Sequence, residues 1–111
     1  MKYFVKDNER IGTCYHEFYK GKWDKHTVWK SDSIFIHDDC LFENPDFQDA
    51  IEEVIPPYDP FGITEITFEE WRKIGEVISI KNLVSQEIYN EADVWLKDVF
   101  EVYGCFTILG I

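Results

Sequence analysis

The sequence predicts a single α+β domain spanning residues 1–111, with a mostly antiparallel sheet packed against about three or four helices. Its length lies in the usual range for one domain. Hydrophobic residues form 45% of the chain and include nine Phe, six Tyr and four Trp, which is enough material for a core. Segments with helical and strand periodicity are mixed without the regular strand–helix alternation of a parallel sheet.

The N-terminal third reads mainly as short strands and turns. Residues 2–6 predict a strand that ends at the turn formers Asp7 and Asn8. Residues 9–19 have apolar side chains at helical spacing and predict a helix, although Gly12 and nearby β-forming residues argue against it. Two further strands are expected at 27–29 and 33–37.

A helix is predicted to begin at Asn44, because an N-cap residue is followed by Pro45 and an acid in the first turn. Its apolar face carries Phe47, Ala50, Ile51 and Val54. Its other face carries Asp46, Asp49, Glu52 and Glu53. Residues 55–62 contain three prolines and predict an ordered loop.

The second half of the chain has clearer helix signals. After a strand at 63–66, Thr67 and Glu70 form a capping-box pattern that opens a helix with Trp71 on its inner face. Ser85 is expected to cap the longest helix, at about residues 86–103, which Gly104 ends. The apolar segment 105–111 predicts a final strand in a central or well-covered position of the sheet.

Charge is the least ordinary feature of the composition. Twenty-two acidic and eleven basic residues give a net charge of −11. Residues 1–31 carry seven Lys/Arg and four Asp/Glu (+3), and residues 32–111 carry four and eighteen (−14). Such a surface repels nucleic acid and anionic lipid and attracts basic macromolecules. The acidity alone is also what a soluble adaptor without catalytic activity would have.

The chain lacks the signals of export and of membrane insertion. The N-terminal residues have no continuous apolar stretch of the kind that a signal peptide needs, and no segment is long and apolar enough for a membrane span. Three cysteines, Cys14, Cys40 and Cys105, are an odd number without paired spacing. These features predict free thiols in a reducing cytoplasm.

No motif indicates an enzyme. Nucleotide-binding glycine loops, a nucleophile elbow and paired Cys/His spacings are all missing, so we expect no catalytic residues, no metal and no cofactor. The densest group of reactive side chains is His37, Asp38 and Asp39, to which His16 and His26 could be added. A small hydrolase or metal-dependent enzyme built on that group is the alternative interpretation.

Three segments of the second half carry a resemblance: residues 66–71 opening a helix, Trp95-Leu96 in the long helix, and residues 106–111 at the end. In these the chain resembles the small bacterial immunity proteins that neutralise toxins of contact-dependent growth inhibition, in particular the ribonuclease-toxin immunity type. The resemblance implies a cytoplasmic α+β inhibitor that binds a cognate toxin nuclease in a 1:1 complex. It transfers no individual functional residue.

Together, the charge and the resemblance predict that an acidic surface covers the basic cleft of a toxin. Carboxylates select a basic partner and speed the encounter, while aromatic side chains anchor the complex. The residues that we expect at this interface are Asp38, Asp39, Asp46, Asp49, Glu52, Glu53, Asp59, Tyr58 and Phe61.

Overall fold

Five strands form one antiparallel sheet in a computed structural model that describes all residues from 1 to 111. The strands are β1 (Phe4–Val5), β2 (Tyr15–Lys20), β3 (Ile34–His37), β4 (Ile63–Thr67) and β5 (Cys105–Leu109). Their order in the sheet is β1-β3-β2-β5-β4. The helices are α1 (Asp38–Glu43), α2 (Pro45–Val54), α3 (Phe68–Ile78) and α4 (Leu83–Tyr103), and a single 3₁₀ turn, η1 (Asp7–Glu9), follows β1.

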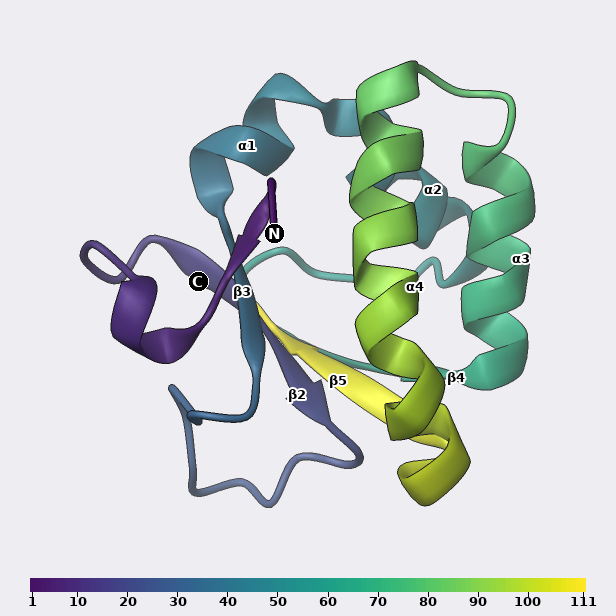
Figure 1. The fold of residues 1–111 in the computed structure, drawn as a ribbon. Coiled ribbons are helices and arrows are strands. Elements are labelled where there is room, and N and C mark those ends of the chain that lie inside the picture. Colours follow the sequence, from purple (N-terminus) through teal and green to yellow (C-terminus); the bar gives the residue numbers. More distant parts are fainter.

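Helices α2, α3 and α4 lie together on one side of the sheet (Figure 1). The alternation of side chains along each strand sends Phe18, Ile36 and Phe106 toward these helices. There they join one core of 19 buried residues, to which α3 contributes Trp71 and α4 contributes Leu96. One continuous core confirms the predicted single α+β domain.

The second face of the sheet, which we call the open face, is covered only in part, by the loop of residues 21–33. Figure 1 shows this loop leaving the sheet between β2 and β3, on the side away from α1. Tyr19, Phe35 and Thr107 of the open face are nevertheless buried. None of the four helices combines the length and apolarity needed to cross a bilayer.

Several elements follow the sequence pattern. Thr67 Oγ1 accepts the Glu70 N–H at 3.2 Å and Glu70 Oε1 accepts the Thr67 N–H at 2.9 Å, so the predicted capping box is confirmed. The final strand β5 is indeed central, between β2 and β4. Pro45 occupies the first turn of α2, as expected, although the Asn44 side chain donates to the Cys40 carbonyl instead of capping α2.

Two predicted elements and one predicted N-cap are wrong, and one helix was not predicted. Residues 15–20 form strand β2, not a helix, and residues 27–29 lie in the loop, where Trp29 has a φ of +57°. The longest helix begins at Leu83, because Asn82 Oδ1 accepts the Ser85 N–H at 2.8 Å and is the N-cap. Helix α1, which begins at Asp38 directly after strand β3, was not predicted.

Candidate functional site

The chain has one long segment without any positive side chain. No lysine or arginine lies between Lys30 and Arg72. The carboxylates of this segment number twelve: Asp32, Asp38, Asp39, Glu43, Asp46, Asp49, Glu52, Glu53, Asp59, Glu65, Glu69 and Glu70. Eight of them lie on α1, α2 and the loop 55–62, and we call these eight, from Asp38 to Asp59, the acidic face.

All seven carboxylates predicted for the interface belong to the acidic face. Asp39, Asp49, Glu52, Glu53 and Asp59 are exposed, so their charges are available to a partner. Two others are partly engaged within the chain. Asp38 Oδ1 lies 2.8 Å from Nε2 of the fully buried His16, and Asp46 Oδ2 accepts the Asn82 N–H at 3.5 Å.

Carboxylates from three different elements of the acidic face lie around Tyr58. Burial raises the pKa of Tyr58, a hydrogen bond from Gln48 opposes the rise, and the charges of Asp38, Asp59 and Glu52 add to it. Three of the sequence-predicted carboxylates, Asp38, Glu52 and Asp59, are thus close enough to Tyr58 to act on its pKa.

Tyr58 itself is not available as an anchor for a partner. Its side chain is only 6% exposed and belongs to the core, and Gln48 Nε2 donates to its hydroxyl at 3.0 Å. The prediction that Tyr58 contacts a partner is therefore corrected. The ring fastens loop 55–62 to α2, because it buries apolar area and its hydroxyl finds a partner on that helix.

Two phenylalanines on or beside the acidic face are exposed. Phe61, which the sequence singled out, is 75% exposed at the end of the proline-rich loop. Phe42 of α1 is 81% exposed, between Asp39 and Glu43, and sequence reasoning missed it. No clear signal in the sequence pointed to Phe42, because adjacent residues of a helix can both be buried, as Ala50 and Ile51 of α2 are.

Two histidines of the alternative enzyme site make contacts within the chain, and the third lies apart from them. His37 is the N-cap of α1, where its Nδ1 accepts the Asp39 N–H at 3.0 Å. His16 is fully buried against Asp38, and its Nδ1 has no hydrogen-bond partner within the chain. His26 lies in loop 21–33, at the other end of the β2–β3 pair. No three His, Cys, Asp or Glu side chains are gathered so that they could hold a metal ion.

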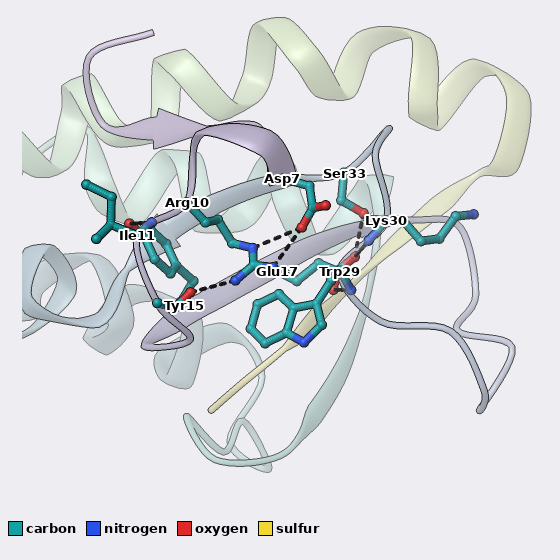
Figure 2. A network of polar contacts seen from close by, with 9 residues as sticks. Asp7, Arg10, Ile11, Tyr15, Glu17, Trp29, Lys30 and Ser33 are labelled. Carbon is teal, nitrogen blue, oxygen red and sulfur yellow. Dashed lines mark hydrogen bonds and ion pairs between the residues drawn. The ribbon is translucent and has the colours of Figure 1, made fainter.

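A second feature lies on the open face, where one buried acid holds loop 21–33 in place. The carboxylate of Glu17, which is 2% exposed, accepts hydrogen bonds from the Trp29 N–H at 2.7 Å, the Lys30 N–H at 3.1 Å and Ser33 Oγ at 2.6 Å (Figure 2). The Arg10 guanidinium lies 3.9 Å from the centre of the Trp29 ring. This network holds residues 29–33 of the loop against the open face of the sheet.

A groove, which we call the sheet groove, lies between the first residues of loop 21–33 and strands β4 and β5. It is lined by Lys22, Trp23, Lys25, Ile63, Glu65 and Thr107, with a volume of about 520 Å³. An adjoining hollow shares Trp23 and Ile63 with it and adds Phe61 and Leu109. Apart from Phe61, none of these residues was predicted at an interface, because they come from three segments that only the fold brings together.

Comparison of the chain with protein-family models, with curated proteins and with solved structures found no match.

Proposed function

We propose that this protein is a cytoplasmic immunity protein that binds a cognate toxin, a ribonuclease, and neutralises it by covering the basic cleft of the toxin. The observation that supports the proposal best is the acidic face: eight carboxylates on three adjoining elements, with no lysine or arginine among them. The resemblance of residues 66–71, 95–96 and 106–111 to ribonuclease-toxin immunity proteins points to the same partner.

The mechanism is competition for a cationic surface. A ribonuclease holds RNA through lysine and arginine contacts with phosphates, and these contacts are largely electrostatic. A folded array of carboxylates is complementary to the same cleft and excludes the RNA from it. Long-range attraction raises the association rate, whereas the lifetime of the complex depends on apolar contacts, for which Phe42 and Phe61 are placed at the acidic face.

The proposal is tested by co-purification with the C-terminal domain encoded by the adjacent upstream gene. RNA cleavage by that domain is then measured with and without this protein. We expect a stable 1:1 complex and loss of cleavage. If no complex forms at low salt or at physiological salt, the proposal is wrong.

Charge reversal on α2 tests the role of the acidic face. In the variant Asp49→Lys/Glu53→Lys we expect the association rate to fall by about ten- to hundredfold, because the electrostatic attraction is weakened. Both residues are exposed, so the thermal unfolding temperature should stay close to that of the wild type. Stopped-flow mixing with the toxin domain measures the rate.

The matched control is Asp98→Lys/Glu101→Lys on α4, which changes the net charge equally but alters exposed positions outside the acidic face. Its association rate should fall much less. Equal slowing in the two variants would mean that only the total charge matters and that α2 is not at the interface.

A further inference from the structure

The two edges of the sheet differ in how they are closed. At the β1 edge, the carboxylate of Glu91 on α4 accepts the backbone N–H groups of Lys2, Tyr3 and Phe4 at 2.8–2.9 Å. The N-terminal strand is thereby fastened to a helix, and its donors are not available to another chain. At the opposite edge, β4 pairs only with β5.

The free side of β4 carries unpaired backbone groups. Gly110 N–H donates to the Gly62 carbonyl at 2.8 Å, and this fixes the alternation along the strand pair. Thr64 and Ile66 therefore direct their N–H and C=O groups to β5, while Ile63 and Glu65 direct theirs outward. In this register no β4–β5 hydrogen bond uses the N–H of Ile63 or Glu65, and neither N–H donates to a carbonyl of a turn or loop. Such an edge is a template for another strand.

The sheet groove lies directly beside this edge. The side chains of Ile63 and Glu65 point to the open face, where Ile63 is 56% exposed and both residues line the groove. A strand that paired with β4 would place every second side chain next to them. Main-chain pairing would then supply affinity, and the groove would supply specificity.

We propose that an extended strand of the toxin adds to the free edge of β4, with an apolar side chain against Ile63 and Trp23 and a lysine or arginine beside Glu65. This inference rests on the proposed function and specifies the contact that anchors the complex. The net charge of −11 favours a basic partner, and loop 55–62, which carries the carboxylate of Asp59 and the exposed ring of Phe61, leads straight into β4.

The groove also contains positive charges. Lys22 and Lys25 line it, and both belong to the loop that follows β2. In the sheet β5 lies between β2 and β4, so a strand added to β4 meets Glu65 before it meets these lysines.

A second copy of this chain is the other possible occupant. It would also carry a net charge of −11, and two such copies repel each other. The basic toxin is favoured for the same reason.

The test uses the toxin domain of the co-purification experiment and the variant Ile63→Pro. Proline removes the outward N–H of Ile63 without removing a β4–β5 hydrogen bond, and a proline is tolerated at the first residue of an edge strand. We expect the Kd of the complex to rise about tenfold or more. The control Ile63→Val keeps the N–H and an apolar side chain, so its Kd should stay within about twofold of the wild type.

Hydrogen exchange of the wild-type chain gives a second readout that needs no variant. The amides of Ile63 and Glu65 should exchange about a hundredfold more slowly in the complex than in the free chain. A folded Ile63→Pro protein with unchanged Kd, or unchanged exchange at both amides, would overturn strand addition and leave the proposed function standing. Protection of both amides in a dimer of the free chain would assign the edge to a second copy and also overturn it. Failure of the wild type to bind the toxin domain removes the proposed function, and this inference with it.

Discussion

Glu17 shows how a single buried charge can organise a loop. It lies in the central strand β2 and points to the open face, where an isolated carboxylate would be costly to bury. Three donors from residues 29–33 surround it, and hydrogen bonds to a charged group are stronger than neutral ones. The acid and residues 29–33 of the loop therefore stabilise each other.

We expect Glu17→Ala to lower the free energy of unfolding by about 2–4 kcal/mol, because the N–H groups of Trp29 and Lys30 lose their acceptor. Urea denaturation followed by tryptophan fluorescence measures the change. Glu17→Gln keeps one acceptor oxygen in nearly the same shape, so its loss should be smaller. If the alanine variant were as stable as the wild type, the network would contribute nothing to the fold.

At the scale of elements, the contact between α3 and α4 depends on one glycine. The rings of Trp71 and Tyr89 stack with centroids 4.3 Å apart, and the Tyr89 hydroxyl donates to the Trp71 carbonyl at 3.0 Å. Gly75 lies one turn after Trp71, and a Cβ there would overlap the hydroxyl and ring of Tyr89. The small residue makes room for the stack.

In the variant Gly75→Ala, a gain in stability from helix propensity therefore competes with a loss of stability from packing. Alanine in a helix interior is about 1 kcal/mol more favourable than glycine, but the overlap with Tyr89 should cost about 1–3 kcal/mol. We expect a net loss of thermal stability in the wild-type background. In the background Tyr89→Ala, the same substitution should instead stabilise the protein, and thermal unfolding of the four proteins of this double-mutant cycle measures the difference.

Local signals predicted the elements that begin with a cap and present one apolar face. The capping box of α3 and the apolar stripe of α2 depend only on residues near each other in the chain, so both were readable. Strand β2 was misread because Tyr15 to Tyr19 are all buried. A strand covered on both faces loses its alternation, and with His16 and Glu17 buried in β2 the aromatic residues Tyr15, Phe18 and Tyr19 imitate helical spacing.

The candidate site was predictable to a similar extent. The carboxylates of α2 follow from helical periodicity, since the apolar face must turn inward and the acids outward. The position of Tyr58 does not follow, because its burial depends on Gln48 and on the path of a proline-rich loop. The sheet groove joins residues from both halves of the chain, so only strand order could reveal it.

For the whole molecule, charge acts on folding and on binding in opposite directions. Of the 22 carboxylates, those of the acidic face have no lysine or arginine near them in the chain, and their mutual repulsion opposes the compact state. The same uncompensated charge is what attracts a basic partner. Stability is thus reduced at the surface that the proposed function requires, which is a common relation at binding sites.

This relation predicts opposite responses to salt. Raising NaCl from about 20 to about 300 mM screens the repulsion, so we expect the free energy of unfolding to rise by about 1 kcal/mol and the association rate with the toxin domain to fall about tenfold or more. Urea denaturation and stopped-flow mixing measure the two quantities. Asp49→Lys/Glu53→Lys changes the net charge from −11 to −7 (−11 + 4), so both responses should be smaller in that variant. A wild type that lost stability as NaCl increased would show that ion pairs outweigh repulsion, and the acidic face would then impose no cost on folding.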